Sequence, residues 1–88
     1  MKLYSLYISK KERKLHILRE MEWDLTEKME EKLYANGIVK HDVAHFLSKD
    51  KETLIKAAKL IKEEWVNESR ERYLSYKNMH IYDKTGTE

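Results

Sequence analysis

The chain has 88 residues, of which 41% are hydrophobic and 39% charged, and its formal net charge is +2. This length suits one domain with a thin core, and the apolar fraction is too high for a disordered segment. Cysteine is absent, which excludes a disulfide framework and a thiolate zinc site. The sequence contains no recognisable signal peptide and no apolar stretch of membrane-spanning length. We therefore expect a cytoplasmic protein that does not contact a membrane.

The first element expected along the chain is a β-hairpin over residues 2–23. Residues 3–8 are rich in strand formers, and a polar run typical of a turn follows them. Leu15, Ile17 and Met21 then alternate with polar residues, which is the period-two pattern of a half-buried strand.

A short helix over residues 25–35 is the next expected element. Asp24 and Glu27 match a capping box at its start, and Gly37 follows as a typical helix terminator. The alternative is a third strand over residues 28–35, although the Glu and Lys residues in this segment have poor strand propensity.

Residues 37–54 are open to two interpretations. In the first, residues 43–48 form a strand that leads into a helix capped by Ser48 or Asp50. This interpretation gives an α+β domain in which a long amphipathic helix packs on the sheet.

The second interpretation starts from the residue types after Gly37. An acid, an aliphatic residue, an alanine and a leucine occur in order at Asp42, Val43, Ala44 and Leu47, and Asp50, Thr53 and Leu54 could cap and anchor a following helix. Residues 37–57 thereby resemble a helix-turn-helix domain, with departures at Ser48 and Lys49. The resemblance implies a small DNA-binding regulator that uses residues 37–60. Its DNA contacts would come from Lys10, Lys11, Arg13, Lys51, Lys56 and Lys59.

The clearest pattern predicts one long amphipathic helix over residues 50–78. Its apolar positions recur at three- and four-residue steps: Leu54, Ala58, Ile61, Trp65 and then Tyr73 and Tyr76. Such a helix is about 40 Å long, whereas a compact domain of this size is about 30 Å across. We therefore expect its end to project from a single domain over residues 1–84. Residues 79–82 would add a short edge strand or close the helix, and residues 85–88 would form a disordered tail.

Aromatic and basic residues gather near the end of this expected helix. Tyrosine together with arginine is typical of binding hot spots. We therefore expect a partner, or a second copy of the chain in a homodimer, to contact Arg70, Arg72, Tyr73, Tyr76, Lys77 and Tyr82.

Catalytic and metal sites have little support in the sequence. His41 and His45 are four residues apart, which would place both imidazoles on one helix face as in zinc-binding helices, but no third ligand is evident. The two glycines are isolated, which excludes the usual phosphate-binding loops. We expect no enzyme, no cofactor and no metal. The sequence leaves open whether a site forms among His16, His41, His45 and His80.

Three features together resemble the small accessory proteins of bacteriophages and prophages. They are the Met-Lys-Leu-Tyr start, the entry into a Lys/Glu-rich helix at residues 46–52, and the absence of cysteine and proline. The resemblance implies a non-enzymatic protein that binds a host or phage macromolecule. Our first hypothesis is therefore a protein-interaction module that inhibits its partner by steric occlusion. The helix-turn-helix regulator is the alternative.

Overall fold

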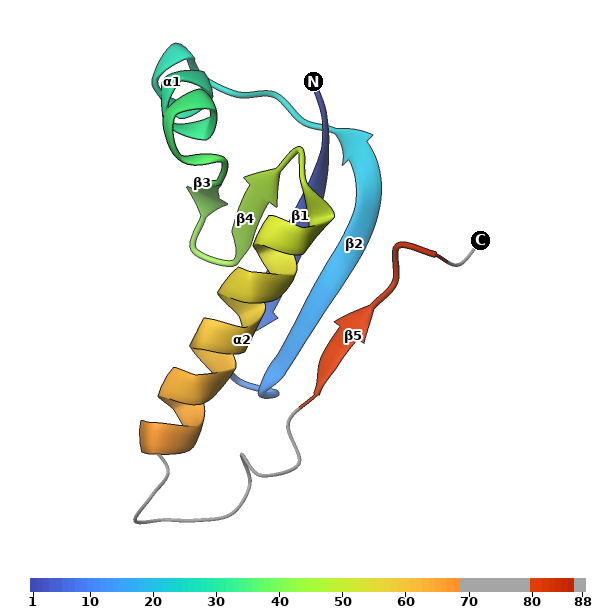
Figure 1. Cartoon of the computed structure of the whole chain (residues 1–88), viewed down its shortest axis with the longest axis vertical. Helices are drawn as coiled ribbons and strands as arrows, with labels where there is room; N and C mark the ends of the chain where they lie inside the picture. Colours follow the sequence, from blue (N-terminus) through green and yellow to red (C-terminus); the bar gives the residue numbers. More distant parts are fainter. Residues whose placement is uncertain (69–79, 87–88) are drawn as a thin grey trace.

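The structure is a computed structural model that describes residues 1–68 and 80–86. In these ranges the strands form one five-stranded sheet with the order β3-β4-β1-β2-β5, accompanied by two helices (Figure 1). The α+β class expected from the sequence is confirmed. In chain order the elements are β1 (Lys2–Ser9), β2 (Lys14–Glu22), α1 (Glu27–Asn36), β3 (Val39–Asp42), β4 (His45–Ser48), α2 (Lys51–Glu68) and β5 (Ile81–Asp83).

The expected N-terminal hairpin is confirmed as β1 and β2, which pair antiparallel. Leu15 and Ile17 are fully buried on one face of β2, while His16 between them lies on the other face. The turn is made without glycine, and Arg13 adopts a φ of 59° in the left-handed region. The period-two pattern of β2 thus identified Leu15 and Ile17 as core residues but not Met21, which is 47% exposed beyond a register shift between Leu3 and Ser5.

The helix expected over residues 25–35 is confirmed as α1, so the alternative third strand over residues 28–35 is wrong. The expected cap at Asp24 is also wrong, because the chain remains non-helical as far as Thr26. The Thr26 hydroxyl oxygen accepts a hydrogen bond from the Met29 N–H at 3.2 Å. At the other end Gly37 has a φ of 80°, and its N–H donates to the Leu33 carbonyl.

Residues 39–48 form a second antiparallel hairpin, so the helix-turn-helix interpretation is wrong. Its first helix would have to include residues 42–47, but β3 and β4 are paired there. The physical reason lies in Phe46 and Leu47, which pack into different hydrophobic clusters on opposite faces of the sheet. Neighbouring residues point to opposite faces only in a strand.

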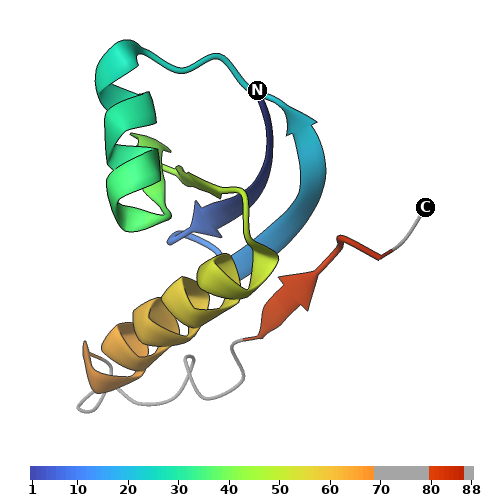
Figure 2. The same cartoon turned by 45° about the horizontal axis from the view of Figure 1, so that its top comes forward.

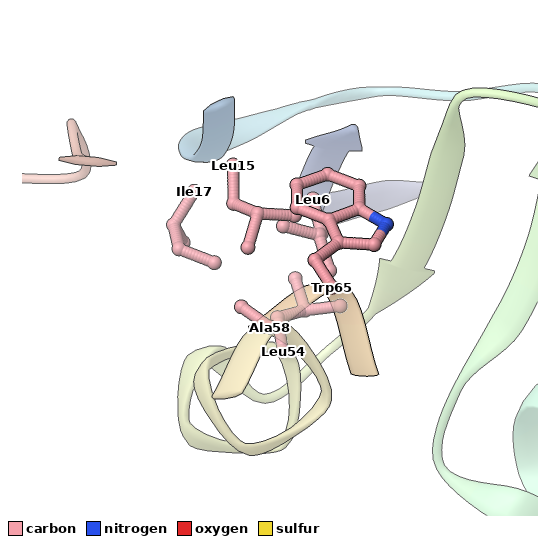
Figure 3. Packing of buried hydrophobic residues seen from close by; sticks show 6 residues of the cluster. All are labelled: Leu6, Leu15, Ile17, Leu54, Ala58 and Trp65. Carbon is pink, nitrogen blue, oxygen red and sulfur yellow. The ribbon is translucent and has the colours of Figure 1, made fainter. Parts of the chain in front are cut away.

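The helix α2 packs on one face of the sheet. Figure 3 shows the side chains of this cluster gathered between helix and sheet: Leu6, Leu15, Ile17, Leu54, Ala58 and Trp65. The Asp50 carboxylate lies at the start of the helix and accepts a hydrogen bond from the Thr53 hydroxyl at 2.8 Å. The long helix is thus confirmed from residue 51 to residue 68, and its expected continuation to residue 78 lies outside the described residues.

Among the described residues, the other face of the sheet is covered only in part, by α1. Leu3, Val39 and Leu47 on this face pack against Leu33 of α1. Figure 2 shows α1 next to the short strands β3 and β4. At the opposite edge β5 pairs parallel with β2, which confirms the short edge strand expected in this region, at Ile81–Asp83. Within the described part of the chain, no helix therefore covers this face over β2 and β5.

Two leucines of α2 test the packing of this helix. Leu54 is fully buried and Leu60 is 64% exposed. We expect Leu54→Ala to lower the free energy of unfolding by about 2–5 kcal/mol, because it removes buried methyl groups and leaves a cavity. Leu60→Ala should change it by about 0.5 kcal/mol or less. Urea denaturation followed by circular dichroism measures both, and equal losses would contradict the observed orientation of α2.

Candidate functional site

One row of side chains crosses the face of the sheet that α2 does not cover. The strand registers pair Asp42 with His45, His45 with Tyr7, Tyr7 with His16, and His16 with Tyr82. Directly paired residues of neighbouring strands lie on the same face. We call these five residues the cross-strand row. It takes one residue from each of β3, β4, β1, β2 and β5 in their spatial order.

The rings of the cross-strand row are in contact along its length. The ring centroids of Tyr7 and His45 are 5.2 Å apart, and those of Tyr7 and His16 are 5.8 Å apart. His16 and Tyr82 are stacked, with centroids 5.1 Å apart and an angle of 21° between the ring planes. These separations are typical of attractive aromatic pairs. The row is therefore a packed assembly of rings rather than a set of independent surface residues.

Further rings extend the row at both ends. The Trp23 ring lies 4.9 Å from His41 and 5.5 Å from His45, measured between centroids. At the β5 end the rings of His80 and Tyr82 are 6.1 Å apart. All four histidines of the chain thus have an aromatic neighbour in this group.

Asp42 fixes the histidines at the β3 end of the row. Its carboxylate oxygens lie 2.9 Å from Nδ1 of His45 and 3.3 Å from Nδ1 of His41, and they accept a 2.9 Å hydrogen bond from the Ala44 N–H. The hydrogen bond with His45, followed by that from Ala44, holds the pKa of Asp42 well below its usual range. An ionised carboxylate here favours a proton on Nδ1 of His45, which leaves Nε2 as the hydrogen-bonding atom directed away from Asp42.

His16 lies between Tyr7 and Tyr82 in the row, in a different environment from His45. Burial lowers its pKa, and the positive charges of Lys84 and Lys14 lower it further, against a small opposing effect of Glu12. Its Nδ1 atom is buried and has no hydrogen-bond partner among the described residues. The lowered pKa favours the neutral form of His16, and the lysines beside it are sources of positive charge.

Those lysines lie on the same face as the rings. Lys14 precedes His16 by two residues on β2, and Lys84 follows Tyr82 by two residues beyond β5. Residues two apart in an extended chain share a face. Both ammonium groups act electrostatically on His16, so they lie toward the β2 and β5 end of the row. The uncovered face thus combines aromatic rings with positive charge.

The partner-binding residues expected from the sequence are only partly placed. Tyr82 belongs to the cross-strand row and is 37% exposed. The other five expected residues, Arg70, Arg72, Tyr73, Tyr76 and Lys77, lie outside the described residues.

The basic residues expected to contact DNA are separated by the fold. Lys10, Lys11 and Arg13 lie in the turn between β1 and β2. The remaining three are on α2, which covers the opposite face of the sheet, and are Lys51, Lys56 and Lys59. Lys51 is engaged in a 2.9 Å ion pair with Asp83. The structure therefore does not unite these six residues in one surface.

Sequence reasoning missed the cross-strand row as a group. His41 and His45 would share a face only if this segment were helical, and they lie instead on β3 and β4. They nevertheless meet through Asp42, which follows His41 directly. The alternation in β2 did mark His16 as facing away from the core side, but its neighbours depend on strand register.

Comparison with protein families, with curated proteins and with solved structures finds no match to this chain. Within residues 1–68 and 80–86, no cluster of three or more histidine, aspartate or glutamate side chains is arranged to hold a metal ion. In the same ranges neither helix is long and apolar enough to cross a membrane.

The lowered pKa of His16 predicts a specific pH dependence of stability. The unfolded chain binds a proton at this residue near pH 6.5, whereas the folded chain binds it only at lower pH. The free energy of unfolding should therefore fall as the pH drops below about 6.5. His16→Gln should remove this part of the decrease between pH 7.5 and pH 5.5, as measured by urea denaturation. A His16 ring that titrates at or above pH 6.5 by NMR would contradict the prediction.

Proposed function

We propose that this protein is a non-enzymatic binding module that takes single-stranded nucleic acid on the uncovered face of its sheet. The observation that carries the proposal is the cross-strand row, in which Tyr7 and Tyr82 are each 37% exposed beside lysines. Aromatic side chains on an open sheet stack with unpaired bases, and neighbouring basic residues contact the phosphates.

The charge around the row supports a polyanionic partner. Lys14 and Lys84 lie toward its β2 and β5 end, and Lys10, Lys11 and Arg13 occupy the turn beyond its β1 and β2 residues. The carboxylate in the row, Asp42, already has three hydrogen-bond partners and so opposes a phosphate less than an unpaired acid would. A nucleic acid strand running along the row would meet this positive charge near β1, β2 and β5.

The chemistry of the rings supports unpaired bases in particular. Tyrosine and histidine both combine a ring surface with a polar atom at the ring edge, so each can stack on a base and hydrogen-bond to its edge. Four neighbouring strands contribute such a ring, and strands are about 4.8 Å apart. The row thus offers several stacking positions in sequence, as in other proteins that bind single strands.

This proposal keeps nucleic acid as a partner but replaces the surface first expected to bind it. Lys56 and Lys59 lie on α2, on the side of the sheet opposite the row. The action that we propose is steric occlusion of the bound strand, in keeping with the phage accessory proteins that the sequence resembles. A protein partner, which is the first hypothesis from the sequence, would need a surface other than the cross-strand row.

The contribution of stacking is tested with Tyr7→Ala. Loss of one base–aromatic stack costs about 1–3 kcal/mol, so affinity for a fluorescein-labelled single-stranded RNA or DNA oligonucleotide should fall about five- to 150-fold. Tyr34→Ala is the matched control, because Tyr34 is 63% exposed on α1 and outside the row. Fluorescence anisotropy measures both. Wild-type protein that does not bind any such oligonucleotide at low salt would overturn the proposal.

The electrostatic contribution is tested with two charge reversals. Lys14→Glu should weaken oligonucleotide binding and make it less salt-dependent, because it removes a phosphate contact beside His16. Lys56→Glu, on the exposed side of α2, should leave both properties unchanged. If Lys56→Glu has the larger effect, the nucleic acid lies on α2 and the row is the wrong surface.

A further inference from the structure

A groove lies between α1 and β3, away from the residues of the cross-strand row. Its volume is about 450 Å³. Lys28 and Lys32 of α1 and Lys40 of β3 line it, together with apolar atoms of Met29 and Val39. The groove is therefore an open surface with both positive charge and apolar contact area.

The strand beside this groove has an unpaired edge. β3 is the first strand in the order β3-β4-β1-β2-β5, so among the described residues it pairs only with β4. The N–H and C=O groups along such an edge are available to an additional strand. Extended peptides commonly bind proteins by adding a strand at a free sheet edge, with side-chain pockets next to it for specificity.

The positive charge of the groove is not neutralised by ion pairs with acidic residues in the described part of the chain. The helix α1 also carries Glu27, Glu30 and Glu31, but these do not line the groove. Spacing of four residues places Lys28 and Lys32 on one face of α1. An acidic ligand would find three uncompensated positive charges here.

We propose that this groove binds an extended acidic peptide segment of a partner protein, which adds to β3 as a further strand. Acidic residues on both sides of the added strand suit the site, because side chains of a strand point to opposite sides at a period of two and lysines lie on both sides of β3. Acidic residues on the side of α1 would meet Lys28 and Lys32, and those on the other side would meet Lys40, which pairs with Phe46. Lysine on an edge strand also discourages unspecific pairing, so only a segment of opposite charge is accepted.

Other occupants fit these observations less well. A second copy that paired β3 with β3 would bring two sets of the same lysines together, and like charges repel. An oligonucleotide would satisfy the lysines but would leave the backbone edge of β3 without a matching strand. The experiment therefore also shows whether a second copy or an oligonucleotide occupies the groove.

The test uses the full chain and a synthetic acetylated peptide of eight residues in which two Glu alternate with two Val, so that acidic residues lie on both sides of the strand. We expect the peptide to shift the NMR amide signals of residues 38–42. The double variant Lys32→Glu with Lys40→Glu should bind it about tenfold more weakly, since each reversed charge replaces an attraction by a repulsion. The matched control is Lys56→Glu with Lys59→Glu on α2, which should bind the peptide as the wild type does.

A second peptide with N-methylated glutamates separates strand addition from simple charge attraction. N-methylation removes the amide donors that pair with a strand edge, so this peptide should lose most of the affinity. Equal binding of both peptides, or no shift at residues 38–42, would overturn the proposal. So would shifts of residues 38–40, which lie outside the cross-strand row, caused by higher protein concentration, which indicate a second copy, or by an oligonucleotide in place of the peptide.

The peptide experiment does not depend on the proposal that nucleic acid binds to the sheet face. Tyr7→Ala should leave peptide binding unchanged, because Tyr7 does not line the groove. Failure of the peptide to bind would leave the nucleic acid proposal intact, and the reverse also holds.

Discussion

The fold depends on one constraint. The sheet has apolar residues on both faces, and each face must be covered by apolar side chains from the rest of this small chain. The central strand β1 illustrates this at neighbouring residues: Leu6 is fully buried under α2, while Tyr7 on the other face is 37% exposed. α2 has 18 residues and covers its face across β1 and β2, whereas α1 has 10 residues and packs over Leu3, Val39 and Leu47. The remaining surface is stabilised by contacts among amphipathic rings.

Sequence periodicity predicted the elements well because local patterns encode them. The alternation at Leu15 and Ile17 identified a half-buried strand, and Gly37 marked the end of α1. The cross-strand row escaped prediction because it depends on register between segments far apart in the chain. Nothing local to Tyr7 indicates that His45 will lie beside it. The spacing of His41 and His45 fitted a helix as well as it fitted a hairpin, and the opposite-facing Phe46 and Leu47 decide for the hairpin.

The two candidate surfaces use positive charge in different ways. On the sheet face, lysines lie near His16 and next to rings, which suits a ligand that alternates flat bases with phosphates. In the groove, lysines flank an unpaired strand edge and apolar side chains, which suits a peptide backbone. The hairpin of β3 and β4 connects them, since Asp42 in the row belongs to the same strand as Lys40 in the groove. A partner at one surface is thus separated from the other by a single short strand.

The exposed width of the sheet face depends on whether the edge strand β5 is paired with β2. Three residue pairs hold it to β2, and the ion pair of Asp83 with Lys51 ties it to the start of α2. Hydrogen bonds from Thr85, followed by that from Lys51, lower the pKa of Asp83 to about 2. Short edge elements open at a lower free energy than the core. Since Tyr82 is the outermost ring, opening of β5 would shorten the stack from four rings to three and turn β2 into a new sheet edge. The ring surface available to a ligand therefore depends on the equilibrium between paired and unpaired β5.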